Sequence, residues 1–277
     1  MSAGVDGARV SGAMQDDAPL LEVDRLLFGP SEQPLAEPLS FRLDPGRCLV
    51  LLGPNGAGKT SLLRTLIGGL APLGGSVRWL GRPPAAMSPR QSAATIAFAA
   101  PRLADIDDFS VEHLLLLGRL GARGPFAQPD DADRRIVDQV LERCGLRALR
   151  ERRLGTLSDG ERQLATLGRA LAQQARVLLL DEPAASLDPG RQATLLDTVA
   201  QLVGEGQAVI LSSHDPNHAL AVADQVLLWQ PDGHILWGDA CDLLDAGRLS
   251  AAYGVAVRRF VDGDGKACFG FGAARAR

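Results

Sequence analysis

Apolar residues along the chain fall into two alternating patterns. Short unbroken runs of Val, Leu and Ile predict strands buried on both faces, whereas apolar residues three and four positions apart predict helices. The predicted strands are 20–26, 40–43, Cys48–Leu52, 176–183 ("RVLLLDEP"), 208–212, 225–229 and 234–238. The predicted helices are 61–67, 110–120, 131–153, 161–174, 190–203 and 216–223. This alternation indicates an α/β fold with a mainly parallel sheet that is covered by helices on both faces.

Three parts of the chain depart from this alternation. Residues 102–157 contain helical segments without intervening strands, so we expect an inserted helical subdomain with Ser110 and Asp131 as helix N-caps. Residues 1–18 are rich in Gly, Ala and Asp and lack the apolar segment of a signal peptide, which predicts a disordered tail. The main domain is expected at 19–238, followed by a C-terminal extension at 239–277.

Composition narrows the class of protein. A net charge of −4 over 277 residues gives no electrostatic reason to expect a nucleic acid partner. The cysteines are widely spaced and form no C-x-x-C pair, so we expect neither a disulfide framework nor a zinc cluster, and a reducing cytoplasm fits. No apolar run approaches the roughly 18 residues that span a bilayer. The sequence therefore predicts a cytosolic protein, which could still dock on a membrane protein.

A glycine-rich segment follows the strand Cys48–Leu52 and precedes a predicted helix. Residues 53–60, "GPNGAGKT", match the phosphate-binding pattern G-x-x-x-x-G-K-[ST] in the context that it requires, although the bare pattern can arise by chance. Glycines let backbone N–H groups wrap phosphates, and the helix N-terminus adds its positive dipole end. We expect Lys59 to contact the β- and γ-phosphates and Thr60 to bind Mg²⁺. The predicted nucleotide-binding residues are Gly53, Pro54, Asn55, Gly56, Ala57, Gly58, Lys59, Thr60 and Ser61.

Two adjacent carboxylates end the apolar run "VLLLDE". Asp181 and Glu182 follow a central parallel strand, at the sheet edge where open α/β sheets bind their ligands. We expect Asp181 to hold Mg²⁺ through water and Glu182 to polarise the attacking water as general base. The alternative is a strand that merely ends in polar surface residues. The neighbouring phosphate-binding loop favours the functional interpretation.

A third motif lies between these two. Residues 157–163, "LSDGERQ", by themselves indicate a capped helix with Ser158 near the N-cap. The order of phosphate-binding loop, helical insertion, "LSDGERQ", "LLLDEP", "SLD" and a histidine at a strand end resembles the ATP-binding cassette ATPases, from about residue 20 to residue 238. The segments "LSDGERQ", "SSHDPNHALAVADQVLL" and "LSAAYGVAVRR" resemble most the importer ATPases for ferric siderophores, haem and vitamin B12.

The resemblance implies a fold and a composite site. The fold would be a P-loop NTPase (RecA-like) core with a mainly parallel sheet, an N-terminal antiparallel β subdomain and an inserted helical subdomain. In a homodimer, the signature residues of one copy would contact the γ-phosphate of ATP held by the other copy, at a helix N-terminus suited to anions. These residues are Ser158, Asp159, Gly160 and Glu161. Ser186 and Asp188 would lie in the loop that crosses the interface, and an ordinary helix start capped by Asp188 is compatible with that role.

The same resemblance implies partners. ATP with Mg²⁺ would be the substrate, and separate membrane permease subunits would dock mainly against the helical subdomain. A substrate-binding protein would act only indirectly, through the permease. The chain would then lie in the cytoplasm, peripheral on the inner face of the cell membrane.

Two positions depart from the family pattern. The family motif "IAYVPQ" corresponds to "IAFAAP", so Pro101 stands where a glutamine normally approaches Mg²⁺ and links the nucleotide to the transporter. Proline has no side-chain donor or acceptor, so we expect metal coordination and coupling through this loop to differ. The position of the aromatic residue that stacks on adenine falls at Pro30. Phe28 is then the candidate platform, and reduced ATP affinity or a rearranged platform is expected.

The segment "LSSHDPNH" contains two histidines four residues apart, a spacing that also occurs in zinc sites on helices. Here a strand runs directly into His214, and Pro216 fits the first turn of the next helix, so the two rings are not expected to share a helical face. Beside Asp181 and Glu182, His214 can instead contact the γ-phosphate and orient the attacking water. His218 is expected to be an ordinary helix residue.

Three classes of function fit the sequence. The first is the ATPase subunit of an importer for iron chelates, haem or cobalamin. The second is a soluble cassette ATPase of DNA repair, translation or regulation, which the lack of long heptad repeats and of a second cassette disfavours. The third is a degenerate interaction or regulatory cassette, which Pro101 suggests and the intact motifs oppose.

Overall fold

The computed structural model describes residues 19–100, 106–123, 128–261, 263 and 265–272. The predicted tail at 1–18 and the position Pro101 lie outside this part of the chain, so the expectations for them remain predictions. No helix in the described ranges is both long and apolar enough to cross a membrane.

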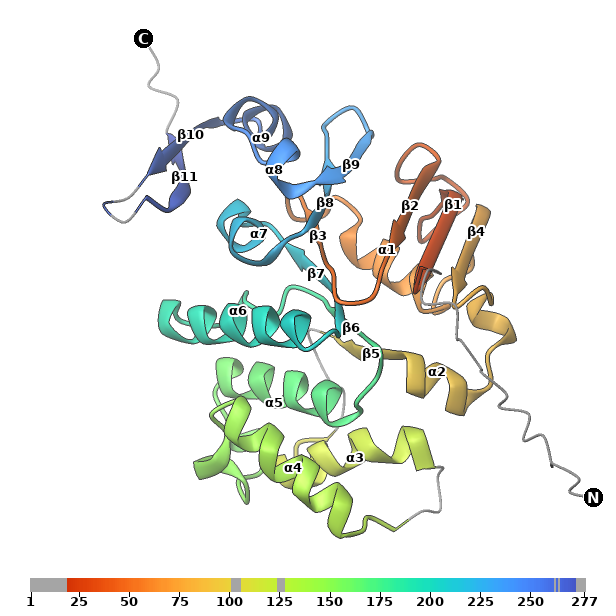
Figure 1. Ribbon diagram of the computed structural model, residues 1–277, viewed down its shortest axis with the longest axis vertical. Coiled ribbons are helices and arrows are strands. Elements are labelled where there is room, and N and C mark those ends of the chain that lie inside the picture. The colour runs from red at the N-terminus through yellow and green to blue at the C-terminus, as the bar shows by residue number, and fades with distance from the viewer. Residues whose placement is uncertain (1–18, 101–105, 124–127, 262, 264, 273–277) are drawn as a thin grey trace, which may run out of the picture.

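A six-stranded sheet runs through the centre of the molecule in the order β5–β6–β7–β3–β8–β9 (Figure 1). Its neighbouring strands are parallel except for β8 and β9, which pair antiparallel. The predicted mainly parallel α/β sheet is therefore confirmed. The strands are β3 (Cys48–Leu52), β5 (Ile96–Ala99), β6 (Val177–Leu180), β7 (Ala208–Ser213), β8 (Gln225–Trp229) and β9 (Ile235–Asp239).

A separate antiparallel sheet forms the N-terminal β subdomain. Its strands are β1 (Leu21–Leu27), β2 (Leu39–Leu43) and β4 (Gly74–Trp79), in the order β2–β1–β4. Near Arg25, the pairing register of β1 shifts against both of its neighbours, β2 and β4. Arg25 itself has a positive φ of 47°. At this bulge β4 supplies Gly75, where an added Cβ would lie 2.2 Å from the Arg25 carbonyl oxygen. Only glycine fits this close approach of two backbones.

Helices cover both faces of the central sheet (Figure 1). The inserted subdomain contains α3 and α4, and α4 is capped by Asp130 rather than by Asp131, because Asp130 and Asp133 form a reciprocal capping box. The Oγ of Ser110 accepts the His113 N–H at 3.2 Å, as expected for an N-cap. The helices are α1 (Lys59–Leu66), α2 (Pro89–Thr95), α3 (Val111–Arg123), α4 (Asp131–Arg143), α5 (Asp159–Ala172), α6 (Pro189–Gly204), α7 (Pro216–Val222), α8 (Ala240–Leu243) and α9 (Ala246–Tyr253), with 3₁₀ turns at Pro84–Ala86, Arg147–Leu149 and Leu154–Thr156.

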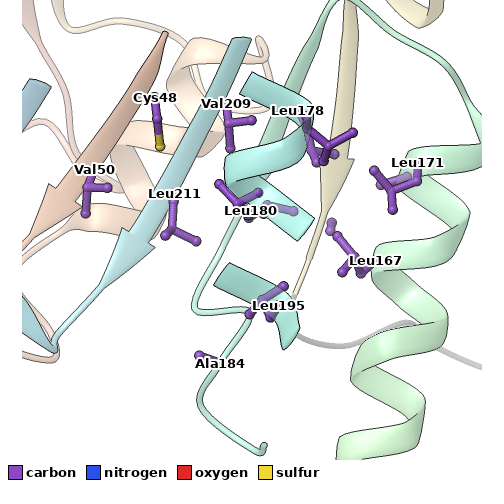
Figure 2. Packing of buried hydrophobic residues seen from close by; sticks show 14 of the residues in the cluster. Cys48, Val50, Leu167, Leu171, Leu178, Leu180, Ala184, Leu195, Val209 and Leu211 are labelled. Atoms are coloured by element: carbon purple, nitrogen blue, oxygen red, sulfur yellow. The ribbon is translucent and has the colours of Figure 1, made fainter. Parts of the chain in front are cut away.

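The core has two layers because successive residues of a strand point to opposite faces. From β3, Cys48, Val50 and Leu52 enter the layer that contains α5 and α6, as Figure 2 shows for the first two. Leu49 and Leu51 enter the opposite layer, which contains α1 and the inner face of the antiparallel sheet. Both layers hold the carboxyl end of β3 in a fixed position.

The C-terminal extension forms helices and a hairpin within its described residues, 239–261, 263 and 265–272. It continues through α8 and α9 into a two-stranded antiparallel hairpin of β10 (Ala256–Val261) and β11 (Ala267–Gly272). Val257 and Phe269 from the hairpin are buried in the core layer that contains α5 and α6. The hairpin is therefore packed onto the main domain.

Candidate functional site

The predicted motifs meet at one edge of the central sheet. The phosphate-binding loop follows β3, Asp181 follows β6, and His214 follows β7. β7 lies between β3 and β6 and runs parallel to both, with Leu180 paired to Leu211 and Leu52 paired to Ser213. Because the three strands end side by side, loops far apart in the sequence form one site.

The phosphate-binding loop turns tightly into α1. Gly58 adopts a φ of 101° immediately before the helix, a conformation that glycine permits. Lys59 is only 5% exposed, and its Nζ donates to the carbonyl oxygens of Gly53 at 2.7 Å and Pro54 at 3.0 Å. The same nitrogen lies 3.1 Å from Glu182 Oε1. The lysine charge is thus held by its own loop and by the neighbouring carboxylate.

Asp181 is fully buried beneath this loop. Its Oδ1 accepts from Thr60 Oγ1 at 3.2 Å and from Ser212 Oγ at 2.8 Å. Its Oδ2 is buried and has no hydrogen-bond partner within the described ranges. Asp181 thus joins α1 to β7 and keeps one oxygen free to accept.

Ser212 is a site residue that the sequence did not predict. Its Oγ also accepts the backbone N–H of Glu182 at 2.8 Å, so one hydroxyl holds both carboxylate residues in place. Serine at a strand end carries no recognisable signal. Its position beside Asp181 follows from the register of β6 and β7.

Glu182 lies between two basic groups. Its Oε1 faces Lys59, and its Oε2 is 2.9 Å from His214 Nδ1. The backbone of Glu182 has a φ of 47°, which is unfavourable for a residue with a side chain and marks a constrained position. A cavity of about 80 Å³ is bordered by Glu182 and His214, among others, and is large enough for water.

The two histidines of "LSSHDPNH" have separate surroundings. His214 precedes α7 and Pro216 is the first residue of that helix, as the sequence predicted. The N-cap of α7 is Asp215. The Nδ1 of His218 is 3.0 Å from Ser213 Oγ, and burial lowers the pKa of this imidazole despite the carboxylate of Asp215. His218 lies within α7, as expected for a helix residue, and it is buried with Ser213 as its hydrogen-bond partner.

The signature residues form a second group with the 186–188 loop. Ser158 caps α5, and the Glu161 carboxylate accepts the Ser158 backbone N–H at 2.9 Å. A Cβ added to Gly160 would lie 3.1 Å from the Ser186 carbonyl oxygen. Asp188 caps α6, which is the ordinary helix start considered as the alternative, and its place at an interface between copies stays a prediction. In the described part of the chain, no hydrogen bond or ion pair links this group to the phosphate-binding loop or to the Asp181–Glu182 pair.

The structure does not support Phe28 as the adenine platform. Its side chain is fully buried in the core layer shared by α1 and the antiparallel sheet. The bulge at Arg25 changes the alternation of β1, so Leu26 and Phe28 both point inward. A Cβ on Gly58 would lie 3.7 Å from the ring, so the buried Phe28 side chain packs close to the loop. A buried ring cannot stack on a base.

Comparison with known proteins gives the family. Residues 36–185 match the family model of ABC transporters. An uncharacterized ABC transporter ATP-binding protein of Haemophilus influenzae is 33% identical, over 84% of this chain and 89% of its own length. The hemin import ATP-binding protein HmuV of Pseudomonas entomophila is 36% identical, over 86% of this chain and 94% of its own length.

Solved structures agree with this match. A metal-chelate type ABC transporter in an inward-facing conformation superimposes with a TM-score of 0.81 and 26% identity, over 93% of this chain and 99% of the matched chain. A bacterial Atm1-family ABC exporter, at 22% identity and a TM-score of 0.69, shares the fold over 87% of this chain and 42% of its own. The chain therefore belongs to the ABC transporter family, as one of its ATP-binding cassette ATPases.

Proposed function

We propose that this chain hydrolyses ATP at the carboxyl edge of its central sheet and thereby energises an importer. The observation that carries this proposal is the position of Glu182, whose two carboxylate oxygens face Lys59 and His214 at 3.1 and 2.9 Å. Lys59 is placed to bind phosphate, and Glu182 to accept a proton from water. His214 is placed to orient that water and to contact the γ-phosphate.

The residues around Asp181 fit Mg²⁺. Mg²⁺ prefers oxygen ligands and is held by few protein groups together with substrate phosphates. Thr60 supplies a hydroxyl, and Asp181 supplies its buried Oδ2, which has no hydrogen-bond partner within the described residues. A role in holding the ion would explain why this buried oxygen is unpaired. When bound with ATP, the ion would neutralise charge on the phosphate oxygens. Ser212 would keep Asp181 oriented toward it.

Each protein group then has a defined task in hydrolysis. The backbone N–H groups of the loop 53–60 and the N-terminus of α1 bind the phosphates. Lys59 exchanges its contact with Glu182 for the β- and γ-phosphates, which frees Glu182 Oε1. Glu182 then takes the proton from the attacking water, and His214 keeps the carboxylate and the water aligned.

Two copies of the chain are needed for a complete site in this proposal. Ser158, Gly160, Ser186 and Asp188 lie together, and within the described residues they make no polar contact with their own phosphate-binding loop. In a homodimer, the N-terminus of α5 from one copy would face the γ-phosphate bound by the other, where its dipole favours negative charge. This arrangement gives two composite sites.

The transport role rests on the relatives. The curated relatives include hemin import proteins and the manganese transport system ATP-binding protein MntA of Synechocystis, which is 34% identical over 67% of this chain and 71% of its own length. The chain would bind permease subunits at the inner face of the cell membrane, with a substrate-binding protein reaching it only through the permease. We propose an iron chelate or haem as the cargo class, with cobalamin as the alternative.

Reconstitution tests this function. The chain, co-purified with its permease and placed in proteoliposomes with the binding protein, is expected to hydrolyse ATP faster when ferric siderophore or hemin is supplied than when cobalamin or Mn²⁺ is supplied. The Glu182→Gln complex is the matched control, and general-base loss should lower its rate by about 10²- to 10⁴-fold. Two results would refute the importer role. One is isolation of the chain from cells without any polytopic membrane protein bound to it, and the other is ATPase activity that is stimulated by DNA or ribosomes instead of by cargo.

A further inference from the structure

The segment that carries His214 is a short hydrogen-bonded turn. The Asp215 N–H donates to Ser213 Oγ at 3.0 Å, and the Asn217 N–H donates to Asp215 Oδ1 at 2.8 Å. His218 then closes the turn through Ser213 Oγ. His214 is half exposed and its ring has only Glu182 as a polar partner among the described residues, so its position depends on this turn.

Asn217 connects the turn to the C-terminal hairpin. Its Oδ1 accepts the Phe269 N–H at 2.7 Å, and its Nδ2 donates to the Phe269 carbonyl oxygen at 3.1 Å. The same Nδ2 donates to Asp215 Oδ1 at 3.0 Å. One side-chain amide thus binds both the backbone of β11 and the N-cap of α7.

The pairing of β10 and β11 explains why Phe269 is available. Phe269 lies opposite Arg259 in the hairpin, and its backbone N–H and C=O both go to Asn217. In antiparallel pairs, every second residue directs these groups away from the partner strand. Asn217 therefore takes the place of a third strand at the free edge of β11. Its amide matches the donor and acceptor of a backbone residue.

A second contact supports the same connection. The ring of Tyr253, the last residue of α9, packs edge-to-face on Phe271 of β11, with 5.4 Å between centroids. Burial raises the pKa of the Tyr253 hydroxyl, and the carboxylates of Asp215 and Glu182 raise it further. The ring contact fixes β11 to the end of α9, so the strand that binds Asn217 is held on two sides.

We infer that Asn217 is a positioning residue through which the C-terminal hairpin holds His214 against Glu182. The inference rests on the proposed role of His214 in hydrolysis. Asn217 fixes the N-cap Asp215, which directly follows His214, and its own position is fixed by two hydrogen bonds to β11. Displacement of the hairpin would move the turn and change the alignment of His214, without any change in the phosphate-binding loop.

A double-mutant cycle tests this inference in the full-length chain. Asn217→Ala is expected to lower kcat for ATP on the order of 10- to 100-fold, the range for a small misplacement near reacting groups, with little change in KM. In a His214→Ala background, Asn217→Ala should have almost no further effect, because the residue acts through His214. Gln207→Ala is the matched control: it removes a side-chain amide that donates to the Ala175 carbonyl oxygen at the opposite end of β7, and should leave kcat unchanged.

Hydrogen exchange provides a measurement that is independent of hydrolysis. Asn217→Ala should speed amide exchange in peptides covering 211–219 and 265–272 together, whereas Gln207→Ala should not. An unchanged kcat for Asn217→Ala, an equal loss in the His214→Ala background, or exchange confined to the hairpin would each overturn the inference. Absence of ATP hydrolysis by the wild-type chain would instead refute the proposed function. Faster amide exchange in both peptides of Asn217→Ala would still show that Asn217 connects the hairpin to the turn.

Discussion

A single hydroxyl organises both carboxylates of the site. Ser212 Oγ donates to Asp181 Oδ1 and accepts the Glu182 N–H, at 2.8 Å in each case. The Glu182 backbone has an unfavourable positive φ, so this hydrogen bond helps to hold a conformation that the residue would not adopt freely.

Ser212→Ala should therefore affect both stability and turnover. It leaves a backbone N–H without its partner in a largely buried place, which costs about 1–3 kcal/mol of the free energy of unfolding. It also releases Asp181 and Glu182, so kcat should fall. Urea unfolding and steady-state ATPase measure the two effects. Thr65→Val serves as the control, because it removes a buried hydroxyl that donates to the Ser61 carbonyl oxygen within α1. Wild-type stability and turnover in Ser212→Ala would show that the hydroxyl has no organising role.

The residues that the sequence predicted and those it missed differ in what determines their position. Lys59, Thr60, Asp181 and Glu182 lie within motifs whose spacing reflects a local strand–loop geometry, and the structure brings them together. Ser212 became part of the site through the register between two strands that are distant in sequence. Phe28 was proposed because it is the aromatic residue near Pro30, and proximity in sequence did not reveal that the bulge in β1 directs its side chain into the core.

At the scale of elements, a buried ion pair connects the helices of the inserted subdomain. Asp133 of α4 is fully buried and accepts from Arg119 Nε of α3 at 2.9 Å. Arg119 also donates to the Ala172 carbonyl oxygen at the end of α5, at 2.7 Å. The inserted helices are thus fixed to the helix that begins with the signature motif.

Asp133→Asn is expected to destabilise the protein by about 3–5 kcal/mol, because it leaves the buried Arg119 without a counter-charge. Denaturant unfolding, followed by far-UV circular dichroism, measures this loss. Glu142→Gln weakens the exposed pair with Arg147 and should not change stability measurably. Equal small effects of the two substitutions would mean that the ion pair does not hold the subdomain.

Strongly patterned elements were predictable, and weakly patterned ones were not. β3 has the bounds that the sequence predicted. Five consecutive apolar residues put apolar side chains on both faces of the strand, so the strand must be buried on both faces. β4 starts with Gly74, Gly75 and Ser76, and β10 and β11 carry exposed Phe260, Val261 and Phe271. These strands exist because neighbouring strands pair with them, so the sequence gives only a weak signal for each.

At the scale of the whole molecule, the separation of two polar groups determines the expected assembly. The phosphate-binding group includes Lys59 and Glu182, and the signature group includes Ser158 and Gly160. Each group is internally hydrogen-bonded or ion-paired, and among the described residues no hydrogen bond or ion pair joins the two groups. A complete site in the proposed function therefore combines the first group of one copy with the second group of another.

Mixing two inactive variants tests this claim most directly. Lys59→Ala removes phosphate binding, and Gly160→Asp places a negative charge where the γ-phosphate would approach, so either homodimer should lack ATPase activity. In a mixed dimer, both lesions meet at one composite site, and the other site receives an intact loop and an intact signature. ATP hydrolysis should therefore reappear when the two inactive chains are mixed. Mixtures that form dimers yet remain as inactive as the separate variants would contradict a site shared between two copies.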